Sequence, residues 1–251
     1  MVAALVVAWE LASRLLDLPA TVLPPPSRIA TALWDQRDAA LHHTLVTLGE
    51  TAVGFAASLI LSIAAAIVMD LVPALRRALY PLLVGSQALP ILVVAPILVL
   101  WFGFGLLPKA VVIVLLTFFP MVVGLVDGFA GVAPEAEDLL RSYGATQRQT
   151  LSKLRFPAAL PRFFTGLRIS VTYAVLGAVY AEYVGAFDGL GIWILTSQKA
   201  FRIDLVFGAV AIVLVLSVVL FAAVSVVERV LMPWSAEWRT MTRQPANSPR
   251  L

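Results

Sequence analysis

The chain has 251 residues, of which 61% are hydrophobic and only 13% are charged, whereas soluble globular proteins carry about 25% charged residues; with a mean hydropathy of +0.94, this composition indicates a membrane protein. The net charge of +3 does not indicate nucleic-acid binding, because the basic residues lie between apolar runs and do not interleave with aromatic side chains. The sequence has no cysteine, which excludes disulfides, thiolate metal sites and a cysteine nucleophile, and its two histidines, His42 and His43, are too few for a histidine-based metal cluster.

Residues 1–18 are mostly apolar and predict a first membrane helix. A cleavable signal peptide is the alternative, but the segment lacks a basic start, and Glu10 and Arg14 interrupt its apolar run. These two residues lie four positions apart, on one helix face, where they can form an ion pair. The prolines at 23–27 cannot continue a helix, so we expect a loop there and a short amphipathic helix within 28–43.

Five further spans are predicted by the requirement of about 20 mostly apolar residues for a membrane helix. No charge occurs from Ala78 to Pro108, and one straight helix of that length would measure about 46 Å, well beyond the hydrocarbon core of about 30 Å. Part of this segment must therefore tilt, break or leave the membrane, with Pro90 and Pro96 as candidate break points. The predicted spans are 45–69, 79–102, 107–129, 161–183 and 205–227.

The distribution of Lys and Arg predicts the orientation of these spans. With the N-terminus in the cytoplasm, the inner segments hold twelve Lys or Arg residues and the outer segments hold five, namely Arg28, Arg37, Lys109, Lys199 and Arg202. Loops rich in Lys and Arg stay in the cytoplasm, so we expect both termini there. Residues 1–233 would form the membrane domain, 185–204 an external loop with room for a short helix, and 234–251 a polar cytoplasmic tail.

Residues 134–157 form a polar and basic loop between the fourth and fifth spans. Pro134 suits a helix start, Gly144 a helix end, and Thr146 can cap a second short helix. Leu139 and Leu140 would be exposed unless a partner protein covers them, which favours a docking surface. A solvated connection between two spans is the alternative.

The spacing of Gly144, nine residues, then Leu154-x-Phe156-Pro157 resembles the EAA loop of ATP-binding-cassette (ABC) importer permeases, which docks its coupling helices into a groove on the ATPase. In this register the Glu-Ala-Ala positions fall on Asp138-Leu139-Leu140, and the literal Glu135-Ala136 lies three residues too early. The resemblance implies ATPase coupling through Asp138, Leu139, Leu140, Arg141, Tyr143, Gly144, Ala145, Leu154, Phe156 and Pro157.

The resemblance extends from about residue 23 to the end. The motifs at 23–27, 95–105 (Ala-Pro-Ile-Leu-Val-Leu-Trp-Phe-Gly-Phe-Gly) and 118–120 (Phe-Phe-Pro) look like the permease group for nitrate, sulfonates, taurine and thiamine precursors, and 141–145 and 172–186 are most similar to members for the hydroxymethylpyrimidine precursor of thiamine. It implies an all-α polytopic protein with six transmembrane helices and the type I importer (MetI-like) fold. It also implies a prokaryotic inner membrane, a homodimer surrounded by membrane lipid, two ATPase copies and an extracytoplasmic solute-binding protein.

The chain lacks the Gly-x4-Gly-Lys-Ser/Thr motif that cradles nucleotide phosphates. We therefore expect no enzyme activity and no cofactor in this chain, with ATP and Mg²⁺ held by the partner ATPase. The expected solute is a thiamine pyrimidine precursor, with nitrate, sulfonate or taurine, and riboflavin as alternatives. A secondary transporter is the alternative class, but no internal repeat is visible; an intramembrane enzyme would need a nucleophile with a base, or a metal cluster, and neither is visible.

Ionisable groups at membrane depth are costly and often functional. Glu182, near the outer end of the fifth span, lies close in sequence to Tyr180 and two to three turns from Tyr173, a combination suited to hydrogen bonding and stacking on a flat heteroaromatic solute. An interfacial aromatic belt with a snorkelling carboxylate is the alternative. The further candidates for the substrate pathway are Glu50, Trp101 and Phe118, and no metal site is expected.

Overall fold

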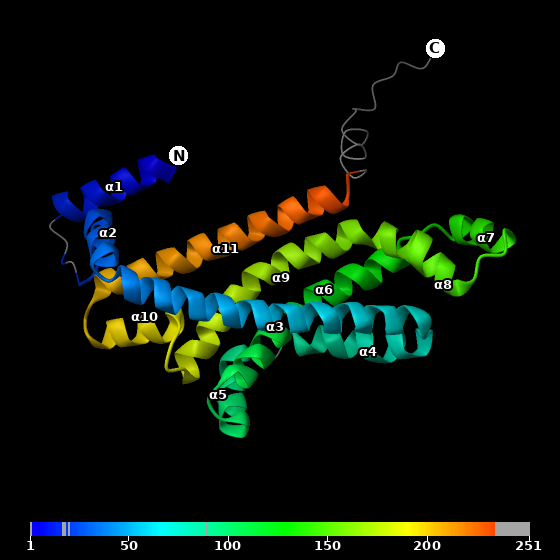
Figure 1. Ribbon diagram of the computed structural model, residues 1–251, viewed down its shortest axis with the longest axis horizontal. Helices are drawn as coiled ribbons and strands as arrows, with labels where there is room; N and C mark the ends of the chain where they lie inside the picture. Colours follow the sequence, from blue (N-terminus) through cyan, green and yellow to red (C-terminus); the bar gives the residue numbers. More distant parts are fainter. Residues whose placement is uncertain (1, 17–18, 20, 89, 234–251) are drawn as a thin grey trace, which may run out of the picture.

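The computed structural model describes residues 2–16, 19, 21–88 and 90–233, and every regular element within them is a helix. Figure 1 shows an elongated bundle, with the turn between α3 and α4 at the same end as α7 and α8, and with α2 and α10 at the other end. The elements in chain order are α1 (Val2–Leu15), α2 (Pro26–Asp35), α3 (Arg37–Leu71), α4 (Pro73–Ser86), α5 (Ile91–Phe102), α6 (Leu106–Ala130), α7 (Pro134–Ser142), α8 (Gln147–Thr150), the π-helix η1 (Leu151–Arg155), α9 (Phe156–Gly185), α10 (Leu190–Lys199) and α11 (Ile203–Leu231).

Four helical segments of the described chain are long and apolar enough to cross a membrane: Arg37–Leu71, Leu106–Ala130, Gln147–Gly185 and Ile203–Leu231. They contain the predicted spans 45–69, 107–129, 161–183 and 205–227, and each begins before the predicted start. The first of them starts eight residues early because the polar segment 37–44 is helical and continuous with the apolar part. The expected amphipathic surface helix within 28–43 is therefore only α2.

The third predicted span, 79–102, is divided between α4 and α5. The chain leaves the helix after Ser86 and resumes at Ile91, with Pro90 in an extended conformation at the N-cap of α5. Proline lacks an N–H group and suits the start of a helix better than its interior. The expected break at Pro90 is confirmed, whereas Pro96 lies inside α5 and does not interrupt it.

The range 1–18, predicted as the first span, contains the 14-residue helix α1. Its length is about 21 Å at 1.5 Å per residue, less than the hydrocarbon core of about 30 Å. The expected ion pair within it is confirmed, because Arg14 Nε donates to Glu10 Oε1 at 2.6 Å. Glu10 Oε2 also accepts the backbone N–H of Ser27 at 2.9 Å, which links α1 to α2. The predicted tail 234–251 lies outside the described residues.

Helices α3, α6 and α9 form the centre of the bundle. At Gly166 of α9 an added Cβ would lie 2.3 Å from the carbonyl oxygen of Pro120 in α6, so the two backbones touch. Buried hydroxyls join the same helices: Thr117 Oγ1 donates to Ser58 Oγ at 2.7 Å, and Ser170 Oγ donates to the Thr117 carbonyl at 2.8 Å. Small residues and interhelical hydroxyl bonds are the usual means of close helix packing in membranes.

Candidate functional site

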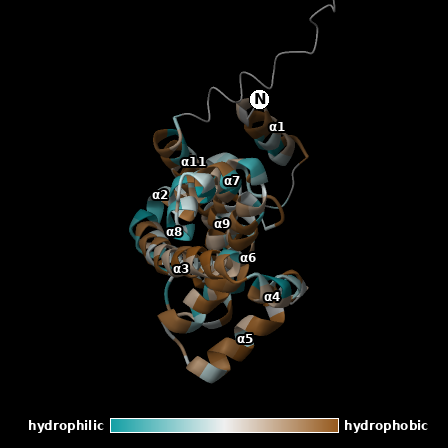
Figure 2. Cartoon of the chain, turned by 90° about the vertical axis from the view of Figure 1, so that its right-hand side faces the viewer, coloured by the Kyte–Doolittle hydropathy of each residue, from teal (hydrophilic) through white to brown (hydrophobic). Residues whose placement is uncertain are grey.

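Helices α7 and α8 project beyond the bundle, and in Figure 2 their hydrophilic surface contrasts with the apolar helices behind them. Helix α7 begins at Pro134, and Gly144, with φ of +79°, ends it. The N–H of Gly144 donates to the Arg141 carbonyl at 2.9 Å and the N–H of Ala145 to the Leu140 carbonyl at 3.0 Å. This pair of bonds is a Schellman motif, which favours glycine at the left-handed position. The predicted helix end is thus confirmed.

The second short helix, α8, starts at the predicted cap. Thr146 Oγ1 accepts the N–H of Gln149 at 3.4 Å, and Gln149 Oε1 accepts the N–H of Thr146 at 2.8 Å, which together form a capping box. The sequence analysis missed that α8 continues without a break through η1 into α9. Since Pro157 and Pro161 cannot donate backbone hydrogen bonds, a π-turn ahead of them allows the helix to continue.

Arg155 connects three elements at the base of this loop. Its Nε and Nη2 donate to the two oxygens of Glu137 in α7 at 2.6 and 2.7 Å, and its Nη1 donates to both oxygens of Asp70 in α3 at 2.8 and 2.9 Å. Only 10% of the Asp70 side chain and 12% of the Glu137 side chain are exposed. The hydrogen bonds from Arg155 hold the pKa of Glu137 below its usual value.

Sequence reasoning treated Arg155 only as one positive charge of the loop. Its partner Asp70 lies 85 residues away, and no local pattern joins the two. The available signal in the sequence is that Arg155 stands between two apolar residues, Leu154 and Phe156. The arrangement fixes α7 and η1 against the end of α3.

The residues expected to couple to an ATPase divide into an outward and an inward group. Leu139 and Tyr143 are 58% and 82% exposed, whereas Phe156 packs against Phe129 with ring centroids 6.5 Å apart. The inward side chains hold the loop in place, and the outward ones are exposed on its surface. The outward group is Asp138, Leu139, Arg141, Tyr143 and Gly144, and the partly buried group is Leu140, Ala145, Leu154, Phe156 and Pro157.

A cavity of about 420 Å³ lies between the end of α3 and this loop. Its lining combines apolar residues with the polar side chains of Asp70, Arg141, Thr150 and Arg155. This recess adjoins α7 through Arg141, so apolar and charged groups lie close together on the loop of α7 and α8.

Glu182, expected in a substrate pathway, is fully buried at the opposite end of α9. Thr47 Oγ1 of α3 donates to its Oε1 at 2.7 Å, and the N–H of Gly191 donates to its Oε2 at 2.7 Å. Thr47 Oγ1 also accepts the N–H of Leu190 at 2.9 Å. These bonds hold the start of α10 against α3, so the Glu182 carboxylate stabilises the fold. Its contact with a solute stays a prediction.

The other expected pathway residues are spread over several helices. Tyr173 of α9 is 45% exposed and Trp101, near the end of α5, is 72% exposed. Tyr180 packs beside the cluster of Ala95 and Leu98, and Phe118 packs against the cluster around Met121. Glu50 forms an ion pair with Lys109, which sequence reasoning did not identify.

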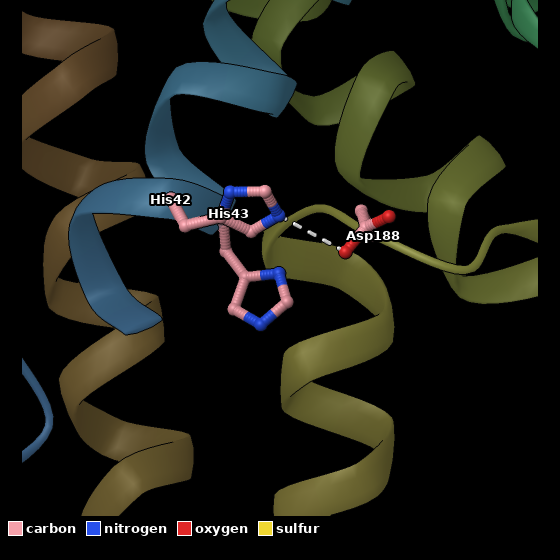
Figure 3. Close-up of side chains that lie close together, drawn as sticks. All are labelled: His42, His43 and Asp188. Atoms are coloured by element: carbon pink, nitrogen blue, oxygen red, sulfur yellow. Dashed lines mark hydrogen bonds and ion pairs between the residues drawn. The ribbon is translucent and has the colours of Figure 1, made fainter. Parts of the chain in front are cut away.

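Figure 3 shows His42, His43 and Asp188 close together where α3 meets the α9–α10 turn. His42 Nε2 lies 3.1 Å from Asp188 Oδ1, and the N–H of Gly189 donates to His43 Nδ1 at 3.1 Å. Histidine counting did not foresee that Asp188 would complete a group of three. The N–H of Gly189 bonds to His43 and the ring of His42 pairs with Asp188, so the group holds the turn against α3.

The sequence of the chain is similar to those of known transport permeases. Residues 58–233 match the sequence profile of the binding-protein-dependent transport system inner membrane component. The chain is 39% identical over 231 residues, 92% of each chain, to the formylaminopyrimidine transport permease protein ThiX of Halalkalibacterium halodurans. It is 34% identical to the riboflavin transport system permease protein RibX of Chloroflexus aurantiacus, over 92% of this chain and 87% of that protein. The taurine transport system permease protein TauC of Escherichia coli is 29% identical, over 93% and 87%.

Among solved structures, the inward-facing MetNI methionine ABC transporter matches with a TM-score of 0.59 and 17% identity, over 80% of this chain and 97% of that chain. This likeness confirms the all-α, MetI-like fold expected from the sequence. Together with the profile match over 58–233, it shows that the chain belongs to the family of binding-protein-dependent transport system inner membrane components, the permease subunits of ABC importers.

Proposed function

We propose that this permease imports an amino-substituted pyrimidine of the thiamine-precursor class. The observation that carries the proposal is the 39% identity, over 92% of both chains, with a formylaminopyrimidine permease. The similarity to the riboflavin and taurine permeases is lower, at 34% and 29%. The chain thus belongs to the same family as all three permeases, and its identity is higher to the formylaminopyrimidine permease than to the riboflavin and taurine permeases.

The energy for import comes from ATP hydrolysis in a separate ATPase subunit that holds ATP and Mg²⁺. In support, the sequence contains no phosphate-cradling motif. The permease itself is then a transport component without catalytic activity or cofactor.

The ATPase docks on the loop of α7 and α8. Leu139 supplies exposed apolar area on α7, and Tyr143 at its end supplies exposed aromatic area. Aromatic residues such as tyrosine commonly anchor protein interfaces. The bonds from Arg155 to Glu137 and Asp70 connect the loop rigidly to α3 and α9. Movement of the ATPase would therefore reach two membrane-spanning segments at once.

The complete importer contains two permease copies as a homodimer, two ATPase copies and an extracytoplasmic solute-binding protein. Both permease termini lie in the cytoplasm. The predicted inner segments hold twelve Lys or Arg residues and the predicted outer segments hold five, which supports this orientation. The loop of α7 and α8 then faces the cytoplasm, and α2 and α10 face the binding protein.

Reconstitution into proteoliposomes with the cognate ATPase and binding protein tests the function. We expect uptake of radiolabelled 4-amino-5-hydroxymethyl-2-methylpyrimidine or its formylamino analogue that requires ATP and both partners, and no comparable uptake of taurine or riboflavin. Uptake of only taurine or riboflavin would overturn the substrate class, and pyrimidine uptake that persists without the ATPase would overturn the mechanism.

A further inference from the structure

A cavity of about 240 Å³ lies at the end of the bundle opposite α7 and α8, between α3, the start of α6 and the α9–α10 turn. Two charged side chains, Glu50 of α3 and Lys109 of α6, line it together with Phe104, Phe187 and Asp188. None of these lining residues belongs to the loop of α7 and α8. The cavity is a separate feature that combines charge with aromatic walls.

The ion pair of Lys109 Nζ with Glu50 Oε1 is almost completely shielded, since 8% and 12% of the two side chains are exposed. Taking two charges out of water costs about as much as their attraction returns, so apolar residues of similar size would stabilise the bundle equally well. Ionisable groups within membrane-spanning helices are typically part of a solute pathway. The pair therefore points to a use beyond packing.

The second oxygen of the Glu50 carboxylate is unsatisfied. Oε2 is buried and has no hydrogen-bond partner within the described part of the chain. The carboxylate of Glu182 differs, because Thr47 and the backbone of Gly191 bond to its two oxygens. Buried acceptors are normally paired, so the carboxylate of Glu50, a residue that lines the cavity, carries an acceptor that no protein group among the described residues uses.

The aromatic walls give the cavity a second kind of recognition. The rings of Phe104 and Phe187 are tilted against each other with centroids 5.6 Å apart, and the two residues are 64% and 81% exposed. Each ring therefore keeps a free face on which a flat heterocycle can stack.

Charge and size restrict the ligand further. Glu50 and Asp188 contribute two carboxylates to the lining and Lys109 contributes one ammonium group, a balance that disfavours a sulfonate. Sites for drug-sized ligands measure about 300–1,000 Å³, so a cavity of about 240 Å³ suits a single ring better than a three-ring flavin.

We propose that this cavity binds the ring of an aminopyrimidine on its way through the permease, with Glu50 Oε2 accepting a hydrogen bond from the exocyclic amino group and Phe104 or Phe187 stacking on the ring. This inference rests on the proposed function and assigns that function a site. It makes Glu50, and not Glu182, the carboxylate that recognises the solute.

The test measures binding of two probes to the purified permease–ATPase complex by calorimetry: 4-amino-5-hydroxymethyl-2-methylpyrimidine and the same compound without the amino group. In the wild type we expect the amino compound to bind about tenfold more tightly, as one hydrogen bond to a charged acceptor gives. In Glu50→Gln, Lys109 holds the amide oxygen, so the amide NH₂ replaces Oε2 and meets the ligand's amino group donor to donor. We expect this variant to lose the preference between the two probes.

The aromatic wall is tested with Phe187→Ala and the matched control Phe201→Ala. Both phenylalanines are strongly exposed, at 81% and 80%, but only Phe187 lines the cavity. We expect weaker binding of both probes in Phe187→Ala and unchanged binding in the control. Uptake per ATP hydrolysed in proteoliposomes should also fall in Phe187→Ala and in Glu50→Gln, and it should stay unchanged in the control Phe201→Ala.

The outcomes separate the site from the function. If the wild type imports the pyrimidine but binds both probes equally, or if Glu50→Gln keeps the preference, the site assignment is overturned and the proposed function stands. If the wild type neither imports nor binds any pyrimidine, both fail. A parallel loss of thermal stability, ATPase activity and uptake in Glu50→Gln, with the probe preference intact, would identify the ion pair as purely structural.

Discussion

Arg155 donates from one guanidinium nitrogen to both carboxylate oxygens of Asp70, at 2.8 and 2.9 Å, and thereby joins two segments that are 85 residues apart. Asp70 lies in the last turn of the membrane helix α3, and Arg155 lies in η1, just before α9. The remaining guanidinium donors bind Glu137 of α7. One side chain thus fixes the loop of α7 and α8 to two membrane-spanning segments.

Replacing Arg155 by alanine should destabilise the permease and uncouple it. We expect a loss of about 2 kcal/mol, between the values for exposed and buried ion pairs, because 24% of the Arg155 side chain is exposed. Arg148→Ala on α8 is the control, since this arginine is exposed. Thermal unfolding in detergent and uptake per ATP hydrolysed measure the two effects; equal results for both variants would contradict the anchoring role.

The same anchor predicts a dependence on pH. The pKa of Glu137 is lowered by its hydrogen bonds to Arg155, so the pair contributes stability that is present above the unfolded-state pKa, about 4.3, and is lost as the pH falls through the lower, folded-state pKa. Limited proteolysis of the loop between pH 7 and pH 3 should show protection that declines at the acid end. Glu137→Gln should lack the acid-dependent part; if its profile equals that of the wild type, other carboxylates govern the loop.

An exposed leucine on α7 should contribute to ATPase docking. Leu139 is 58% exposed, and Leu41, near the other end of the bundle, is 59% exposed. We expect Leu139→Ala to lower co-purification of the ATPase, with a loss of about 1–2 kcal/mol of binding free energy from the apolar area removed. Leu41→Ala should leave co-purification unchanged. A similar decrease in both variants would indicate a general effect of surface leucines.

The helix end at Gly144 offers a conformational test. With φ of +79° and no heavy atom within 4 Å of an added Cβ, alanine would meet strain but no clash, which should cost about 1 kcal/mol. We expect Gly144→Ala to reduce stimulation of the ATPase by the loaded binding protein, and Gly144→Asn to reduce it less. Gly49→Ala, in an equally open position of α3 without the positive φ, should have no such effect. Full stimulation in Gly144→Ala would show that the Schellman turn is dispensable.

Structural features were predictable from the sequence when the interacting residues are close together along the chain, and not when they are far apart. The helix ends at Gly144 and Thr146 and the break at Pro90 were predictable, because glycine, threonine and proline act on their own backbone or the adjacent turn. The pairs Asp70–Arg155 and Thr47–Glu182, 85 and 135 residues apart, were not predictable, because helical periodicity carries no information about which helices become neighbours.

The substrate side of the protein shows the same limit. Glu182 and Glu50 look alike in the sequence, as single carboxylates in apolar segments, and only their surroundings distinguish them. Both oxygens of Glu182 bond to protein groups, while Glu50 keeps one oxygen without a partner among the described residues. The sequence shows that both carboxylates lie in apolar segments. Their different environments result from the packing of α3, α6 and α9, which the sequence does not reveal.

The fastening of the α9–α10 turn to α3 can be tested at Thr47. Its hydroxyl donates to Glu182 and accepts the N–H of Leu190, so Thr47→Val leaves a buried carboxylate oxygen and a buried N–H without this partner. Each such group costs about 1–3 kcal/mol, and we expect a clear drop in the thermal unfolding temperature. The control is Thr44→Val on the same helix, which removes only a bond to the Ala40 carbonyl within α3. If Thr47→Val is no less stable than this control, the turn is held by its other contacts, such as the bond from Gly191 to Glu182 and the pair of His42 with Asp188.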